Sequence, residues 1–179
     1  MKIKIPTYKK LKINLKYYLI NSNPKTFNEW KAKYENLFLK YLKSWMYKEN
    51  IDFKLIPKYY EVMFYWGFIN YKRETKLINL LLKNKYEVKR SNLKLDAIFK
   101  VDLIAIKDKT KYFIQLKNTK SNLSEDERMT LIHYSNLKQA IPILVYVKQK
   151  DIISASYTHL LAHETIIKHV WRLPLENKT

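Results

Sequence analysis

Two short segments in the middle of the chain have the apolar pattern of β-strands. Residues 101–106 read Val-Asp-Leu-Ile-Ala-Ile, and residues 113–117 read Phe-Ile-Gln-Leu-Lys. Both segments are rich in branched or aromatic side chains, and the polar stretch 107–111 between them is typical of a turn. The pattern therefore predicts a hairpin.

Polar side chains interrupt the apolar pattern of this hairpin. Because side chains alternate along a strand, we expect Asp102 to share a face with Ile104, and Gln115 to share a face with Lys117. An acid, an amide and an ammonium group are costly to bury together unless they bind something. A divalent metal ion, a water molecule and a phosphate group would meet that requirement.

The first third of the chain has helical periodicity. Thr26 and Glu29 have the spacing of a capping box, in which two side chains satisfy each other's free backbone donors. Apolar residues then recur at helical spacing, at positions 27, 30, 34, 37, 38, 41, 42 and 45. Before this helix, the alternating apolar residues of 13–19 predict a short strand, and after it Pro57 opens a second helical region.

The second helical region contains an aromatic segment and an acid. Residues 59–71 are dense in aromatic side chains, which is typical of a core or an interface, with base stacking as the alternative. The only glycine, Gly67, predicts a bend or a close approach of helices. Residues 70–84 predict a helix with an apolar stripe. Glu74 lies about one turn before the first residues of the stripe, and its side chain is expected to point along the middle of that stripe. Alternatively, Glu74 favours the dipole of the helix start and only borders the stripe.

The second half of the chain alternates strands and helices. Ser124 and Glu127 form a second capping box, which opens a helix to about residue 139 with Met129, Ile132 and Leu137 inward. The other predicted elements are strands at 86–88 and 141–147, one long strand or a strand with a break at 95–106, and a closing helix at 158–171. This order predicts an α/β fold, with a mixed β-sheet flanked by helices. We expect residues 1–57 to form a mostly helical extension and residues 58–179 to form the core domain.

The composition of the chain indicates what kind of partner it binds. The chain has 35 Lys and Arg against 16 Asp and Glu, a net charge of +19, which favours a polyanion such as nucleic acid. An AT-rich genome also encodes many lysines, but codon usage does not account for the small number of acids. Four arginines are few for reading bases, so contacts to the phosphate backbone are favoured.

Composition also excludes several classes of protein. Without cysteine there is no disulfide, zinc thiolate site or cysteine nucleophile, and with one glycine no P-loop, Rossmann or α/β-hydrolase motif can form. His159 and His163 have a spacing that can bind zinc, but no HExxH motif accompanies them. No apolar run reaches the length of a membrane span and the first residues lack a signal-peptide pattern, so we expect a cytoplasmic protein.

Taken together, these residues resemble the PD-(D/E)XK nuclease superfamily. Its pattern is an acid on a helix, an acid on a strand, a hairpin, and then an acid-x-lysine on the next strand. In this chain the pattern is carried by residues 73–88, 101–105 and 114–120. The resemblance covers about residues 70–147 and looks most like archaeal Holliday-junction resolvases and the homing and restriction endonucleases. It implies a restriction-endonuclease-like core.

The resemblance also implies a metal site. Asp102, the side-chain oxygen of Gln115 and the carbonyl of Leu116 would hold Mg²⁺ or Mn²⁺, and Glu74 would bind the ion through water or hold a second one. Gln115 stands where the usual pattern has an acid, so the ion should bind more weakly unless Glu74 or Asp96 compensates. Asp96 has an alternative place at the solvent-exposed start of the strand.

The remaining implied roles concern the substrate. Lys117 would orient the attacking water and stabilise charge on the phosphorane, and Lys100 and Lys120 would contact phosphates unless they are simply solvated lysines. We therefore expect a metal-dependent DNA endonuclease, either structure-selective or site-specific. The alternatives are a nucleic-acid-binding module with weak or no activity and an RNA-directed nuclease. Cutting two strands predicts a homodimer or a higher oligomer, with the aromatic segment as the candidate interface.

Overall fold

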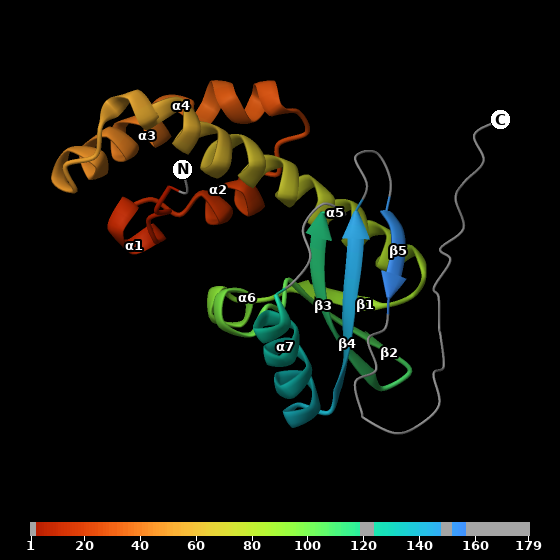
Figure 1. Cartoon of the computed structure of the whole chain (residues 1–179). Helices are drawn as coiled ribbons and strands as arrows, with labels where there is room; N and C mark the ends of the chain where they lie inside the picture. The colour runs from red at the N-terminus through yellow and green to blue at the C-terminus, as the bar shows by residue number, and fades with distance from the viewer. Residues whose placement is uncertain (1–2, 119–123, 148–151, 157–179) are drawn as a thin grey trace. The chain divides into compact units, whose positions relative to one another are not determined.

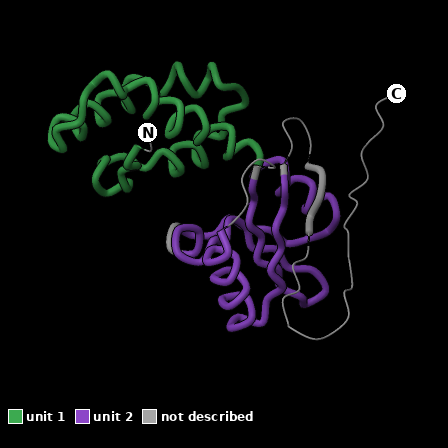
Figure 2. Tube along the Cα trace, in the orientation of Figure 1, with its two compact units in different colours: residues 1–73 green, residues 74–179 purple. Residues whose placement is uncertain are grey.

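The computed structural model describes residues 3–118, 124–147 and 152–156, and the chain divides into two compact units, residues 1–73 and 74–179 (Figures 1 and 2). The division falls later than the predicted boundary after residue 57. The reason is that the buried aromatic residues of 59–71 pack into the core of the N-terminal unit rather than into the sheet domain.

The regular elements in the described part of the N-terminal unit are all helices. Its elements are α1 (Tyr8–Leu11), α2 (Leu15–Ser22), α3 (Phe27–Lys48), η1 (Phe53–Leu55), α4 (Ile56–Tyr59), the π-helical turn η2 (Tyr60–Tyr65) and the first half of α5 (Trp66–Lys83). The strand predicted at 13–19 is wrong, because the side chain of Asn14 accepts a hydrogen bond from the Tyr17 N–H at 3.1 Å and caps α2.

Helix α3 confirms the predicted amphipathic helix. The Thr26 hydroxyl accepts from the Glu29 N–H at 3.2 Å, while the Glu29 carboxylate accepts from the Lys25 N–H at 2.7 Å, one residue before the position that a capping box uses. The buried side chains of α3 are Trp30, Phe38, Leu42, Trp45 and Met46.

Most of the aromatic segment supplies core, although Tyr65 and Trp66 are each 37% exposed. Phe64 lies at the centre, with its ring 5.0 Å from that of Trp30 and 5.2 Å from that of Phe38, both stacked. Tyr59, Phe68 and other buried residues complete the same cluster. Gly67 is not a point of close approach, because a Cβ there would meet nothing within 4 Å.

The second unit is built on a five-stranded sheet in the order β1-β2-β3-β4-β5. The strands are β1 (Glu87–Arg90), β2 (Leu103–Lys107), β3 (Thr110–Asn118), β4 (Ala140–Val147) and β5 (Ile152–Ser156). The β3–β4 pair is parallel and the other neighbours are antiparallel, so the sheet is mixed. Helix α7 (Glu125–Leu137) is the crossover between β3 and β4 (Figure 1). The predicted α/β class with a mixed sheet is confirmed.

The predicted hairpin is formed by β2 and β3. Leu103 lies opposite Ile114, and Lys107 lies opposite Thr110. Asp108 and Lys109 form the turn with φ values of 48° and 65°, and two positive φ values are the signature of the tight turn that matches the strand twist. This register brings the start of β2 beside Gln115 on β3.

The strand predicted at 95–106 is wrong in its first half. Residues Leu93–Phe99 form helix α6, because the Asn92 side chain accepts from the Leu95 N–H at 2.9 Å and begins the helix, and Lys100 ends it with a φ of 58°. Asp96 therefore lies in the first turn of a helix and not on a strand with Asp102. Of the two places expected for Asp96, in the metal site or outside it, the position in the helix agrees better with a place outside the site.

Helix α7 begins with the predicted capping box, in which both reciprocal hydrogen bonds between Ser124 and Glu127 are present. Its inward face differs in part from the prediction. Ile132 is buried as expected, but Met129 is 49% exposed and Leu137 67% exposed, and Leu131 and Ser135 are buried in their place.

Two apolar clusters cover the two faces of the sheet. Leu77 and Leu81 of α5 pack with Leu103, Ala105, Ile114 and other residues on one face. Val101, Phe113 and Ala140 pack with Leu131 of α7 on the other, next to Phe99 of α6. None of the described helices is long and apolar enough to cross a membrane. The predicted closing helix at 158–171, which contains His159 and His163, lies outside the described residues.

Candidate functional site

Asp102 is held just before β2 by two backbone hydrogen bonds and one hydrogen bond to its side chain. Its N–H donates to the Ile114 carbonyl at 2.8 Å, and its own carbonyl accepts from the Ser91 N–H at 2.9 Å. Its carboxylate oxygen Oδ2 accepts from the Leu116 N–H at 2.7 Å. The side chain is buried, and the carboxylate lies directly against the peptide that joins Gln115 to Leu116. The hairpin thus brings the predicted acid to the predicted Gln-x-Lys segment.

Gln115 has a buried side-chain oxygen without a donor. Its Nε2 donates to the Leu116 carbonyl at 3.3 Å, which orients the amide. Its Oε1 has no hydrogen-bond partner among the described residues, although the residue is only 7% exposed. A buried polar atom left unpaired costs about 1–3 kcal/mol. A cation or a water molecule at Oε1 would remove that cost.

Lys117 is paired with a carboxylate that the sequence did not assign to the site. Its Nζ lies 3.7 Å from Oε2 of Glu127 on α7, and Nζ of Lys100 lies 3.3 Å from Oε1 of the same carboxylate. Burial raises the pKa of Glu127, but the hydrogen bond from Lys100, the charge of Lys117 and the Ser124 N–H lower it, and the net pKa falls below its ordinary value. Glu127 is therefore ionised at neutral pH.

Glu74 is buried on the face of the sheet that α5 covers. Its Oε2 lies 3.2 Å from Nε of Arg90, and Nη2 of Arg90 donates to the Thr75 hydroxyl at 2.7 Å. Arg90 lies opposite Leu103, which belongs to the α5 side of the sheet. Gln115 and Lys117 follow Phe113 in alternation, and Phe113 packs on the α7 side. The predicted catalytic residues are thus divided between the two faces of the sheet.

The oxygen atoms at the hairpin fit a hard cation. No cluster of three or more His, Asp or Glu side chains that could hold a metal occurs in the part of the chain that the structure describes. The available ligands are the Asp102 carboxylate, Gln115 Oε1 and the Leu116 carbonyl, all of them oxygen, which is the donor type that Mg²⁺ and Ca²⁺ prefer. The unpaired Oε1 is the structural observation that favours an ion there.

Of the two lysines predicted to contact phosphates, the structure describes one. Lys100 lies at the end of α6 and shares Glu127 with Lys117, so it does belong to the same cluster. Lys120 lies outside the described residues.

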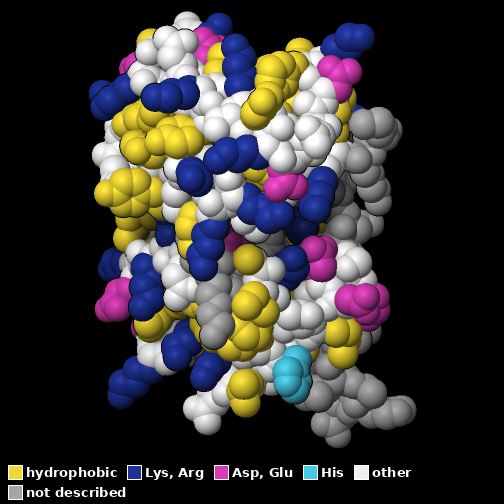
Figure 3. Space-filling view, turned by 90° about the vertical axis from the view of Figure 1, so that its left-hand side faces the viewer, with side chains coloured by type: hydrophobic (Ala, Val, Ile, Leu, Met, Phe, Trp, Pro, Cys, Tyr) yellow, Lys and Arg dark blue, Asp and Glu magenta, His cyan; other side chains and the backbone are white. Residues whose placement is uncertain are grey.

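Basic side chains extend beyond this cluster. In the face shown in Figure 3, Lys and Arg cover more surface than Asp and Glu. The N-terminal unit alone has 16 Lys and Arg against 5 Asp and Glu among residues 1–73. An excess of basic side chains of this kind suits a polyanionic partner.

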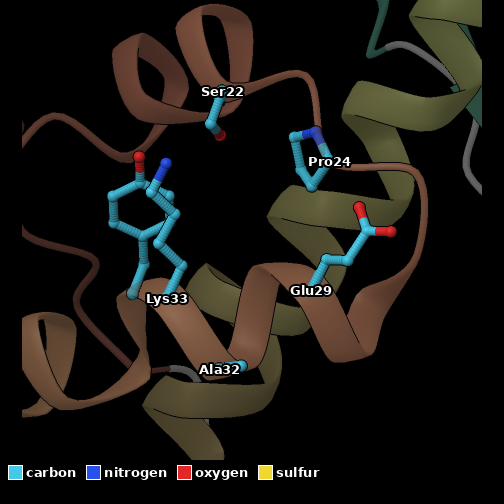
Figure 4. A pocket seen from close by; sticks show the side chains of 6 residues that line it. Ser22, Pro24, Glu29, Ala32 and Lys33 are labelled. Atoms are coloured by element: carbon cyan, nitrogen blue, oxygen red, sulfur yellow. The ribbon is translucent and has the colours of Figure 1, made fainter.

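A separate hollow of about 420 Å³ lies in the N-terminal unit, lined by Ser22, Pro24, Glu29, Ala32, Lys33 and Tyr34 (Figure 4). It contains none of the residues predicted for the metal or for catalysis. The Glu29 carboxylate at its edge already serves the start of α3. The hollow is therefore not part of the candidate site.

Comparison with known proteins gives a weak likeness to a solved structure. No family model and no curated protein matches the chain. Among solved structures, the chain is similar to Hjc, a Holliday junction resolvase from Archaeoglobus fulgidus, with 20% identity and a TM-score of 0.40 over 48% of this chain and 71% of that one. A likeness of this strength assigns neither a family nor a function, so the functional proposal has to rest on the residues described above.

Proposed function

We propose that the protein is a metal-dependent DNA endonuclease that hydrolyses phosphodiester bonds. The observation that carries this proposal is the buried, unpaired Oε1 of Gln115 beside the buried carboxylate of Asp102, two residues before Lys117 on the same face of β3. This combination supplies oxygen ligands for a hard cation and an ammonium group at the same end of a hairpin. The high net charge of +19 supports a polyanionic substrate.

Each residue has a proposed role. Asp102, Gln115 and the Leu116 carbonyl would hold Mg²⁺ or Mn²⁺, which when bound polarises a phosphate and lowers the pKa of a water molecule. Lys117 orients that water towards the phosphorus and stabilises the negative charge that develops on the phosphate oxygens. Glu74 is held by Arg90 on the other face of the sheet, so we leave it out of the ligand set of this ion. Lys100 and Lys120 contact phosphates of the DNA backbone.

Branched DNA and specific duplex sites are both compatible with this chemistry. With four arginines the chain has few bidentate base readers, which favours recognition of backbone shape over dense base contacts. Cleavage of two strands requires two active sites, so we propose a homodimer or a higher oligomer.

A second function, nucleic-acid binding without cleavage, is favoured by one specific observation. The site has a neutral amide where the superfamily pattern has an acid, and the carboxylate of Glu74 is ion-paired with Arg90. Both features reduce the negative charge available to a metal ion. An RNA-directed role has less support, because much of the aromatic segment 59–71 is core.

The deciding experiment compares Asp102→Asn with Asp108→Asn. Asp108 is an exposed acid in the hairpin turn, and asparagine tolerates its positive φ, so this control removes the same charge without touching the site. Plasmid, a synthetic four-way junction and RNA are incubated with EDTA, Mg²⁺ or Mn²⁺, and oligomeric state is followed by light scattering. We expect cleavage by the wild type and Asp108→Asn and none by Asp102→Asn. Wild-type cleavage by Asp102→Asn would reject the assignment, and binding without cleavage in the wild type would favour the second function.

A further inference from the structure

One carboxylate in the second unit lies between two ammonium groups from different elements. Glu127 of α7 has Oε1 3.3 Å from Lys100 Nζ and Oε2 3.7 Å from Lys117 Nζ. The three side chains are only 22–31% exposed, so solvent screens this arrangement less than it screens an ordinary surface ion pair. Lys100 follows α6 and Lys117 belongs to β3, so Glu127 links three parts of the unit.

Backbone contacts fix the three members of this cluster. The Ser124 hydroxyl accepts from the Glu127 N–H at 3.2 Å, and Glu127 Oε2 accepts from the Ser124 N–H at 3.4 Å, so the carboxylate is part of the capping box. The Lys100 N–H donates to the Leu95 carbonyl at the end of α6. Lys117 is in the regular ladder between β3 and β4, opposite Tyr146. The arrangement thus depends on local structure as well as on the mutual attraction of the charges.

Without the carboxylate, the two ammonium groups would repel each other and move apart. A phosphodiester has two non-bridging oxygens and one negative charge, and it can take the place of a carboxylate between two ammonium groups. We propose that Glu127 is a positioning residue that keeps Lys100 and Lys117 together as a two-point cradle for one backbone phosphate. This inference rests on the proposed function in so far as it takes Lys117 to act on a phosphate.

Glu127→Gln separates this role from helix capping. Glutamine at the same position of a capping box still accepts a hydrogen bond from the first backbone N–H, so the helix start is kept while the charge is lost. Asp126→Asn is the matched control, because Asp126 is an exposed acid in the same first turn of α7. Circular dichroism and thermal unfolding of both variants show whether each is folded before any comparison is made.

The two measurements are DNA affinity in EDTA, by fluorescence anisotropy on a labelled four-way junction, and the single-turnover cleavage rate at saturating DNA with Mn²⁺. Removing the charge that neutralises the two lysines should tighten overall binding to DNA by about three- to tenfold, even though the lysines are no longer aligned on one phosphate. Losing the alignment of Lys117 should slow saturated cleavage by about tenfold or more. A purely structural role would not produce opposite changes in affinity and rate, and Asp126→Asn should change neither by more than about twofold.

Several outcomes overturn the proposal. Glu127→Gln behaving like Asp126→Asn would show that the carboxylate positions nothing. Faster cleavage by Glu127→Gln would show that Glu127 is an inhibitory counter-ion. Weaker Mn²⁺ binding by this variant would show that Glu127 is a metal ligand. Parallel losses of DNA affinity and stability would show that its role is structural.

The affinity measurement separates this inference from the proposed function. If the wild type cleaves nothing with either metal, the nuclease proposal fails, but binding still tests the cradle. Tightening by Glu127→Gln that disappears when Lys100 and Lys117 are both changed to Ala supports the cradle. Tightening that persists in that background overturns it.

Discussion

Gln115→Glu is the substitution that tests the proposed metal site most directly. It replaces the unpaired buried Oε1 with a carboxylate oxygen of nearly the same shape, beside the Asp102 carboxylate. Two unit charges 4 Å apart interact by ~1 kcal/mol in water and ~4 kcal/mol at the effective dielectric typical near a protein surface. A divalent ion doubles the attraction, while repulsion from Asp102 and the cost of burial offset part of it. We expect the ion to bind about 10- to 100-fold more tightly.

The same change should destabilise the metal-free protein. Two neighbouring buried carboxylates raise each other's pKa and lower the free energy of unfolding, by ~1–3 kcal/mol. Saturating Mn²⁺ should recover that loss, since each tenfold gain in affinity adds ~1.4 kcal/mol of stability at a fixed, saturating concentration. The assay is thermal unfolding over a Mn²⁺ titration, read beside calorimetric titration of the folded protein.

Asn79→Asp is the matched control for this experiment, because it adds one negative charge at an exposed position of α5. It should change neither the stability nor the response to Mn²⁺ by a measurable amount. If the Mn²⁺ titration of Gln115→Glu is the same as that of the wild type, residue 115 does not face the ion, and the proposed ligand set is refuted.

The remaining predictions concern lysines and pH. Lys117→Ala should abolish cleavage and leave the fold intact, whereas the control Lys111→Ala, on the same face of the same strand, should stay active. Full activity of Lys117→Ala would show that this lysine only packs. The slope of log K for DNA against log salt should be at least about −4, and neutralising Lys100 or Lys117 should flatten it by about one unit each, whereas Lys33→Ala, in the N-terminal unit, should act on it less. The depressed pKa of Glu127 means that its ion pairs stabilise the fold above the ordinary glutamate pKa and that this stabilisation is lost as pH falls through the lower folded-state value. Acid unfolding of Glu127→Gln should therefore depend less on pH in that window than acid unfolding of the wild type, and identical pH profiles would contradict the assigned ion pairs.

The features that were predictable from the sequence are those determined by neighbours in the chain. The capping box of Ser124 and Glu127 and the strands of the hairpin depend on residues within a few positions of each other. Leu95 to Phe99 show the limit of this reasoning. Their apolar side chains suit a strand as well as a helix, and the outcome depends on the Asn92 cap and on the left-handed backbone at Lys100.

The site shows the same limit at longer range. Glu127 was recognised for its hydrogen bond to the start of its own helix, but its contacts with Lys100 and Lys117 depend on how α7 packs on the sheet. The pairing of Glu74 with Arg90 likewise joins α5 to β1 across sixteen positions of sequence. The sequence offered one signal for this pair. Arg90 is one of only four arginines in the chain, and it comes shortly before the proposed site.

Charge balance gives a physical reason for the amide at position 115. The described groups named above for the proposed site and its ion pairs are three carboxylates and three cations, namely Asp102, Glu74, Glu127, Lys117, Lys100 and Arg90. The charges of these groups cancel, so a divalent ion bound through Gln115 would leave a positive excess that a phosphate would offset. A glutamate in place of Gln115 would satisfy half of that excess before any substrate arrived. With the amide, a proposed metal ion and a phosphate would neutralise each other, and each should therefore bind more tightly in the presence of the other.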